Sequence, residues 1–266
     1  MSNSPAVEFR NISKSFPGVT ALDDVSITIR EGECHALIGE NGAGKSTLGK
    51  ILSGLYRADT GDILLFGKAA DLGTPAAAMA AGVAIVHQEL VFCDNLSIAE
   101  NLFLHDMPHN GPFVNRAAMR ESAAKWLAAV KADIDPDEII GKLPLGKQQL
   151  VQIAGALGLG AKVVVFDEPT SSLTLPEVES LFAQIDQLKA MRVTCIYVSH
   201  RMDEIFRLCE SVSVLRDGKH VATKPIGELD RKELVRLMVG RDIGSTEPLY
   251  ADLGEPLLEV DRKSTR

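Results

Sequence analysis

Cysteines are few in this chain of 266 residues, basic residues are outnumbered by acidic ones, and no apolar run is both long and unbroken. Cys34, Cys93, Cys195 and Cys209 include no CxxC pair and have no histidine at metal-ligand spacing. We therefore expect reduced, mostly buried thiols and no metal site at these cysteines. The net charge of −8, from 28 basic and 36 acidic residues, gives no general attraction to nucleic acid or anionic lipid, so no nucleic-acid partner is expected.

The two most apolar stretches are too short or too interrupted to suggest a membrane span. Residues 75–86 are rich in alanine, and residues 150–166 are broken by glutamine, lysine and three glycines. The first ten residues contain no basic region followed by an apolar run. We therefore expect no secretory signal and a chain that stays in the cytoplasm.

The composition favours a folded protein with both strands and helices. Hydrophobic residues make up 45% of the chain and charged residues 24%, which allows a substantial core in one or two globular domains. Segments rich in β-branched residues alternate with helical patterns, as is typical of parallel strands joined by helices. The expected strands are residues 7–13, 25–29, 34–38, 61–65, 83–86, 163–166, 194–198, 211–216 and 220–223. The sequence thus predicts an α/β core.

The strand signal disappears between about residues 90 and 160, where the pattern favours helices at 116–130 and 147–159. We interpret this region as a helical insertion in the α/β core. Capping boxes at residues 97–100 and 230–233, and a proline at position 75, mark helix starts. Trp126 is expected to pack against its own helix's neighbours, and His105 and His109 are expected to lie in a loop and bind no metal.

The most specific motif follows the expected strand 34–38 and opens a helix. It consists of Gly39, Glu40, Asn41, Gly42, Ala43, Gly44, Lys45, Ser46 and Thr47, and it matches the G-x-x-x-x-G-K-S pattern of a phosphate-binding loop. Glycines allow backbone N–H groups to turn toward phosphates, and the following helix adds its positive amino end. We expect Lys45 to bridge the β- and γ-phosphates of a nucleotide, Ser46 to bind Mg²⁺, and Thr47 to donate near the α-phosphate.

Polar residues also follow other expected strands. The apolar strand 163–166 ends in Asp167 and Glu168, and two carboxylates there require a positive partner. Asp167 suits Mg²⁺, directly or through water, and Glu168 is placed to act as the general base on an attacking water. Gln88 and His200 follow expected strands too, at the carboxyl ends where ligands gather in open α/β sheets. Alone, either residue is more often only a polar or structural side chain.

Together these motifs resemble those of ABC ATPases over residues 6–240. The resemblance is carried by the phosphate loop, Gln88, the Gly-Lys-Gln-Gln segment at 146–149, residues 167–174 and the Ser-His pair at 199–200. It implies a P-loop NTPase (RecA-like) core with an antiparallel β subdomain and an inserted α-helical subdomain. It also implies ATP and Mg²⁺ between two ATPase halves, with Phe16 stacked on adenine, Gln88 at Mg²⁺ and linked to a transmembrane partner, and His200 at the γ-phosphate.

Finer features are similar to ATP-binding subunits of monosaccharide importers, such as those for ribose, galactose and xylose. They are the segments 16–22, 39–41, 86–90, 199–206 and 238–241. The match is to the amino-terminal half of subunits with two fused halves, so residues 241–256 are expected to form a linker and 257–266 the start of a second half. The implied partners are permease subunits at the cytoplasmic face of the membrane, a second ATPase half or a second copy, and indirectly a sugar-binding protein. The alternatives are a soluble ABC ATPase outside transport, an importer ATPase for another small polar solute, and a P-loop kinase.

One segment departs from the family pattern. The family signature is Leu-Ser-Gly-Gly-Gln, whereas this chain has Leu143, Pro144, Leu145, Gly146 and Lys147. Pro144 has neither a hydroxyl nor an N–H group to donate to a phosphate, although a proline is also simply a good first-turn residue. Our hypothesis is that the two ATP sites, each formed between two ATPase halves, are unequal. A dimer of this chain alone would then hydrolyse ATP slowly.

Overall fold

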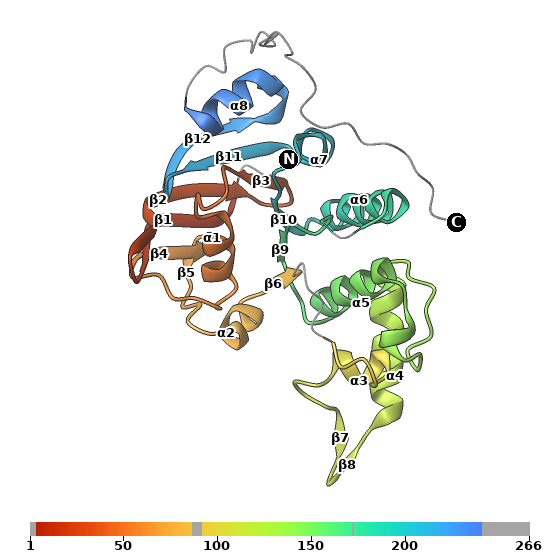
Figure 1. The fold of residues 1–266 in the computed structure, drawn as a ribbon. Helices are drawn as coiled ribbons and strands as arrows, with labels where there is room; N and C mark the ends of the chain where they lie inside the picture. Colours follow the sequence, from red (N-terminus) through yellow and green to blue (C-terminus); the bar gives the residue numbers. More distant parts are fainter. Residues whose placement is uncertain (1–3, 87–91, 172, 241–266) are drawn as a thin grey trace, which may run out of the picture.

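The computed structural model describes residues 4–86, 92–171 and 173–240, whose elements are arranged in layers (Figure 1). Gln88, the expected linker at 241–256 and the expected start of a second half at 257–266 lie outside the described residues. None of the helices in the three described ranges combines the length and the apolar composition needed to cross a bilayer.

An antiparallel sheet is formed near the amino terminus, in the order β2-β1-β4-β5. Its strands are β1 (Pro5–Phe16), β2 (Val19–Arg30), β4 (Thr60–Leu65) and β5 (Lys68–Ala69). β1 and β2 form a hairpin with Phe16 opposite Val19, and both are longer than the expected strands 7–13 and 25–29. The added residues are mostly exposed or half-buried, so pairing with the neighbouring strand, and not an alternating apolar pattern, extends these strands.

A second sheet has the order β12-β11-β3-β10-β9-β6, with only the β12–β11 pair antiparallel. Its strands are β3 (Cys34–Ile38), β6 (Val83–Val86), β9 (Val163–Asp167), β10 (Thr194–Val198), β11 (Ser211–Arg216) and β12 (Lys219–Pro225). Every residue of β3 and β10 is buried, which explains why the central strands read as continuous apolar runs. The expected α/β core is confirmed.

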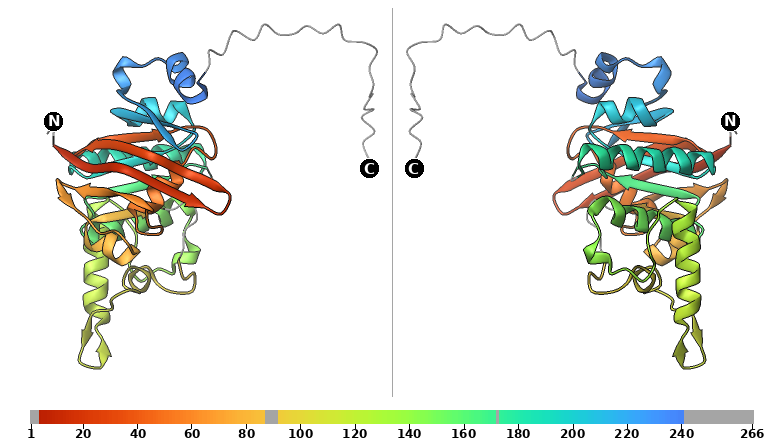
Figure 2. Two further views of the ribbon diagram at one scale, coloured as in Figure 1. Left: turned by 90° about the vertical axis from the view of Figure 1, so that its left-hand side faces the viewer. Right: turned by 90° about the vertical axis from the view of Figure 1, so that its right-hand side faces the viewer.

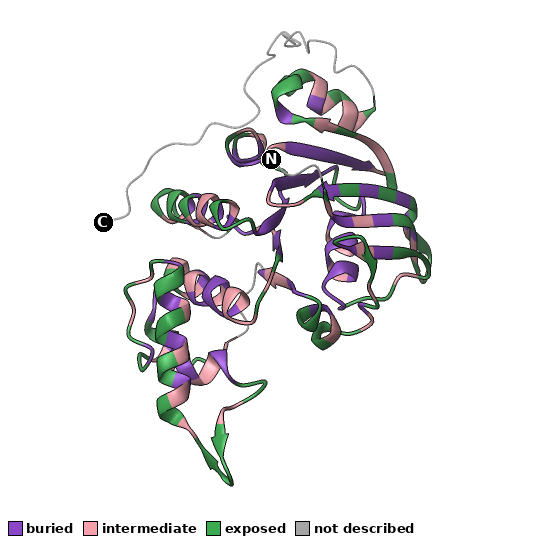
Figure 3. Ribbon diagram, turned by 180° about the vertical axis from the view of Figure 1, so that it is seen from behind, coloured by how far each residue is buried: buried purple, intermediate pink, exposed green. Residues whose placement is uncertain are grey.

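Both faces of the parallel sheet are covered by apolar side chains, and the strands of this sheet are coloured mostly as buried in Figure 3. One face packs with α1 (Lys45–Leu52) against the antiparallel sheet, and Leu37, Val165 and Ile196 belong to this core. The other face packs against helices that include α6 (Leu175–Ala190), α7 (Met202–Leu208) and α8 (Arg231–Val239). A short 3-10 turn, Ile226–Glu228, joins β12 to α8, and α2 (Pro75–Ala80) precedes β6 with Pro75 in its first turn, as predicted.

Between β6 and β9 the described chain is mainly helical. Its elements are α3 (Ile98–Leu102), the hairpin β7 (His109–Asn110) and β8 (Phe113–Val114), α4 (Arg116–Ala129), the 3-10 turn Ile140–Lys142 and α5 (Leu145–Gly158). The predicted capping box at Ser97 and Glu100 is confirmed, and Trp126 packs as expected, with its ring 4.7 Å from that of Phe103. The hairpin projects away from the sheets (Figure 2). Because His109 is the first residue of β7, the prediction that it lies in a loop was wrong.

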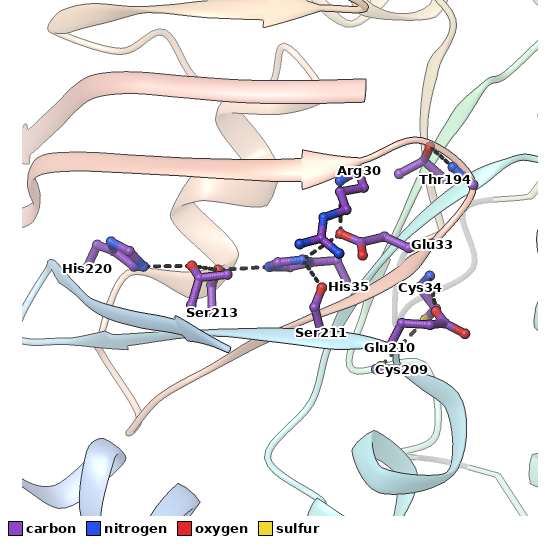
Figure 4. A network of polar contacts seen from close by, with 12 residues as sticks. Arg30, Glu33, Cys34, His35, Thr194, Cys209, Glu210, Ser211, Ser213 and His220 are labelled. Carbon is purple, nitrogen blue, oxygen red and sulfur yellow. Dashed lines mark hydrogen bonds and ion pairs between the residues drawn. The ribbon is translucent and has the colours of Figure 1, made fainter. Parts of the chain in front are cut away.

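A line of polar side chains crosses the parallel sheet from β12 to β3 (Figure 4). His220 Nε2 lies 2.9 Å from Thr223 Oγ1, which lies 2.6 Å from Ser213 Oγ. Ser213 Oγ lies 2.8 Å from Nε2 of the fully buried His35, whose other nitrogen is 3.1 Å from the Glu33 carboxylate. Burial alone would raise the pKa of the Glu33 carboxyl, but its hydrogen bonds, first with His35, outweigh burial and hold that pKa below its ordinary value. Glu33 therefore stays ionised inside the fold.

Candidate functional site

The phosphate-loop motif at residues 39–47 forms the turn between β3 and the amino end of α1, as predicted. Gly44, the residue before the helix, has φ of 99°, in the left-handed region that favours glycine. A Cβ atom on Gly44 would lie 2.5 Å from the carbonyl oxygen of Ala21 in β2. A Cβ atom on Gly39 would lie 2.1 Å from the carbonyl oxygen of Leu215 in β11. The loop is therefore held between the two sheets at approaches that only glycine allows.

The middle of the loop is open to solvent. Glu40, Asn41 and Gly42 are exposed, Ala43 is buried, and Thr47 in the first turn of α1 is half-buried. The N–H of Ala43 donates to the Glu40 carbonyl oxygen at 3.1 Å, which closes a tight turn. A tight, exposed turn at a helix amino end is the arrangement that binds phosphates in such motifs.

Lys45 lies over the loop that precedes it. Its side-chain ammonium donates to the carbonyl oxygens of Gly39, at 3.0 Å, and Glu40, at 2.9 Å. Burial lowers the pKa of Lys45, and the nearby carboxylates of Glu168 and Asp167 oppose that shift. The loop thus already holds a buried positive charge beside two carboxylates, and this charge suits an anionic ligand.

Ser46 and Asp167 come together from distant parts of the chain. The Ser46 hydroxyl, in the first turn of α1, donates to Oδ1 of Asp167, at the end of β9, over 3.0 Å. A hydroxyl and a carboxylate are oxygen ligands of the kind that Mg²⁺ takes, usually together with phosphate oxygens and water. Within the described ranges no three His, Cys, Asp or Glu side chains form a metal cluster, but Mg²⁺ shared with phosphates needs none. These two residues therefore fit the expected metal.

Glu168 and His200 also meet, because each follows one of two neighbouring parallel strands. The backbone N–H of Glu168 donates to the Val198 carbonyl oxygen at 2.9 Å, with Glu168 at φ of 48°. Oε1 of Glu168 then lies 3.2 Å from Nδ1 of His200. The Glu168 side chain is 28% exposed and that of His200 59%, so both can reach a ligand outside the sheet edge. The structure pairs a carboxylate with an imidazole next to the loop.

Phe16 lies at the end of β1, one turn before the part of β2 that touches the phosphate loop. Its half-buried ring meets Tyr56 edge-on, with ring centres 5.3 Å apart, and the Lys14 ammonium lies 5.5 Å from its centre. Its contact with adenine stays a prediction. Gln88, the other expected nucleotide and metal contact, lies outside the described residues.

The segment that departs from the family signature begins α5. Pro144 caps this helix without a side-chain hydrogen bond, and the helix starts two residues before the predicted 147–159. The N–H of Gly146 donates to Oε1 of Glu177, at 3.3 Å, while Oε2 of Glu177 accepts from the N–H and hydroxyl of Thr174. The Glu177 carboxylate on α6 therefore already accepts a hydrogen bond from one backbone N–H group at the amino end of α5. Sequence reasoning missed Glu177, although Thr174 and Glu177 have capping-box spacing.

Comparison with known proteins places these features in a family. The family model described as ABC transporter matches residues 22–171, more than half of the chain. The chain is 51% identical over 257 residues to the ribose import ATP-binding protein RbsA of Chromobacterium violaceum, covering 96% of this chain and 51% of the relative. It is 46% identical over 243 residues to the arabinose import ATP-binding protein AraG of Escherichia coli O157:H7, covering 91% and 48% respectively. The chain thus spans about half the length of the curated relatives it matches.

Solved structures share the fold. A nucleotide-free ATP-binding cassette from an ABC transporter has a TM-score of 0.73 at 25% identity, covering 89% of this chain and 96% of that one. The ADP conformation of another such cassette has a TM-score of 0.74 at 26% identity, covering 89% and 99%. The predicted P-loop NTPase fold is confirmed. Since its family model covers more than half of its residues and solved cassettes share its fold, the chain belongs to the ABC transporter family.

Proposed function

We propose that this chain is an ATP-binding and ATP-hydrolysing unit that powers import of a monosaccharide through a membrane ABC transporter. The observation that carries the proposal is the meeting of the phosphate loop, the Ser46–Asp167 pair and the Glu168–His200 pair at the carboxyl ends of β3, β9 and β10. Ligands bind at this edge in open α/β sheets. The class of cargo comes from the relatives, which are named ribose and arabinose import ATP-binding proteins.

The phosphate chain of ATP would be bound by Lys45 and by the backbone N–H groups of residues 39–47. Lys45 would exchange its two carbonyl acceptors for phosphate oxygens, and a hydrogen bond between two charged groups is about twice as strong as a neutral one. Ser46 and Asp167 would hold Mg²⁺, with Gln88 as the expected third ligand, and the ion when bound supplies positive charge beside the phosphate oxygens. Phe16 would stack on the adenine.

Glu168 would take the proton of the attacking water. Its carboxylate is part-exposed at the edge where the γ-phosphate would lie, and His200 Nδ1 at 3.2 Å restricts its orientation. His200 would also contact the γ-phosphate through its exposed ring. Positioning these two side chains beside the phosphate loop accounts for hydrolysis with no covalent intermediate on the chain.

The chain would work as one of two ATPase halves at the cytoplasmic face of the membrane. Its partners would be permease subunits, and indirectly a sugar-binding protein outside the cell, with Gln88 as the link from the metal site to the permease. Pro144 and the Gly146–Glu177 contact leave the start of α5 a poor phosphate donor. We therefore keep the hypothesis of two unequal sites, in which a second half supplies the better signature.

The test has two parts. The purified chain should release phosphate from ATP only with Mg²⁺, and Lys45→Ala should abolish release while Lys125→Ala, an exposed lysine on α4, should not. Co-expression with a permease of a monosaccharide importer should give a membrane complex whose ATP turnover rises with sugar-loaded binding protein. Wild-type chain that binds no ATP, or that purifies in a soluble nucleic-acid complex without permease, would refute the proposal.

A further inference from the structure

Glu204, in the first turn of α7, is a buried carboxylate that the mechanism above does not use. Its side chain is 5% exposed. A carboxylate in such a place is unfavourable unless donors surround it. Which donors surround Glu204 shows what it holds together.

Each oxygen of Glu204 accepts two side-chain donors. Oε1 accepts from the Thr170 hydroxyl at 2.7 Å and from the Arg201 guanidinium at 2.9 Å. Oε2 accepts from the Tyr197 hydroxyl at 2.8 Å and from the Ser199 hydroxyl at 3.0 Å. The carboxylate is therefore fully satisfied by donors from outside its own helix.

Three of these donors, Thr170, Ser199 and Arg201, belong to the two loops that carry the proposed catalytic pair, and Tyr197 belongs to β10. Thr170 follows Glu168 by two residues, in the loop after β9. Ser199 and Arg201 stand on either side of His200, in the loop after β10, and the Ser199 hydroxyl also accepts the Arg201 N–H at 3.0 Å. One buried side chain thus bonds to both loops, while the side chains of Glu168 and His200 are partly exposed.

We propose that Glu204 is a positioning residue that fixes the separation of Glu168 and His200. The inference rests on the proposed function, because it assigns Glu204 to the same hydrolytic site. Glu204 would not touch the nucleotide; it sets the register of the two loops and thereby the 3.2 Å contact between Glu168 and His200. Positioning of this kind matters because a displacement of about 1 Å costs about a hundredfold in rate.

The four contacts suit a carboxylate at this position. Three of the donors are hydroxyl groups, and an ionised carboxylate is an acceptor on both oxygens. Burial, and then the neighbouring Glu204 carboxylate, raise the pKa of Tyr197, so its hydroxyl keeps its proton and donates. A glutamine would remove the charge that faces Arg201, and its NH2 group would require the Tyr197 and Ser199 hydroxyls to turn from donors into acceptors, which would rearrange the contacts with little change in volume.

The experiment compares Glu204→Gln with Glu33→Gln, the matched control. Glu33 is a buried carboxylate just before β3, at the end of that strand opposite the phosphate loop. It is bonded to the Arg30 N–H and to His35, and it is remote from the loops that carry Glu168 and His200. For Glu204→Gln we expect kcat to fall about ten- to a hundredfold, with KM for ATP within about twofold, because the phosphate loop is untouched. Glu33→Gln should lose about as much thermal stability as Glu204→Gln, but its kcat should stay within about twofold of the wild-type value.

A double-mutant cycle separates positioning from general destabilisation. His200→Ala should cost much less rate in the Glu204→Gln background than in the wild type, because both act on the same pair. NMR signals of the His200 imidazole should shift in Glu204→Gln and not in Glu33→Gln, whether or not ATP is turned over. The inference would be overturned if the rate losses of His200→Ala and Glu204→Gln multiplied in the double variant. It would also be overturned if the His200 signals were unchanged in Glu204→Gln. Wild-type chain that hydrolyses no ATP would count against the proposed function, and the NMR comparison would still decide the role of Glu204.

Discussion

Replacing Glu168 by glutamine should separate ATP binding from ATP hydrolysis. The amide oxygen of glutamine can still accept a hydrogen bond from His200 over the same 3.2 Å, so the two loops should keep their places. What is lost is the group that takes the proton of water, and a positioned general base contributes about 10²–10⁴ in rate. This corresponds to about 3–5 kcal/mol of activation free energy. The phosphate loop and Lys45 stay intact.

Binding should become slightly tighter in this variant. Glu168 and Asp167 both act on the Lys45 charge, and removing one of two carboxylates leaves a more positive site for an anionic ligand. The assay is single-turnover hydrolysis of radiolabelled ATP beside fluorescence titration with a labelled nucleotide. Glu179→Gln, which removes the same charge from an exposed position on α6, is the control. Unchanged hydrolysis in Glu168→Gln, or weaker ATP binding, would refute this reasoning.

Three further predictions concern the base, the signature segment and acid stability. Phe16→Ala should raise the Kd for ATP about five- to a hundredfold in titrations and leave that for inorganic triphosphate unchanged, because stacking on a base is worth about 1–3 kcal/mol; equal losses for both ligands would contradict the adenine contact. Pro144→Ser should raise turnover of the isolated chain about tenfold in a phosphate-release assay, since a hydrogen bond to a charged group contributes about 1.5–3 kcal/mol. The folded pKa of Glu33 lies below its ordinary 4.5, so its stabilisation is present above that pH and is lost as pH falls through the folded pKa. The difference in free energy of unfolding between wild type and Glu33→Gln, from denaturant melts, should therefore shrink below about pH 4; a constant difference would show that the charge is irrelevant.

Much of the candidate site could be predicted because its signals are local in sequence. The glycines, Lys45 and Ser46 lie within eight consecutive residues, and Asp167 and Glu168 end an apolar strand. The order of the parallel strands then brings these segments together, as the phosphate-loop hypothesis requires.

The residues that were missed act through partners distant in sequence. Glu204 meets Thr170 across 34 positions, and Glu177 meets Gly146 across 31. No spacing rule connects such pairs before the fold exists. The strands predicted for β1 and β2 were too short for a related reason. The polar ends of a hairpin are ordered by the opposite strand and carry no periodic signal of their own.

The hydrogen bonds along the line of side chains from His220 to His35 share one direction of donation. Each hydroxyl between the two rings has one proton to give, so Thr223 and Ser213 must point the same way when both use that proton along the line. Nδ1 of His35 faces the ionised Glu33 carboxylate, which can only accept, so Nδ1 carries the proton of the neutral ring and Nε2 accepts from Ser213. Donation then runs inward from Nε2 of His220 through Thr223 and Ser213, so the buried charge of Glu33 fixes the tautomer of a ring at the edge of the sheet.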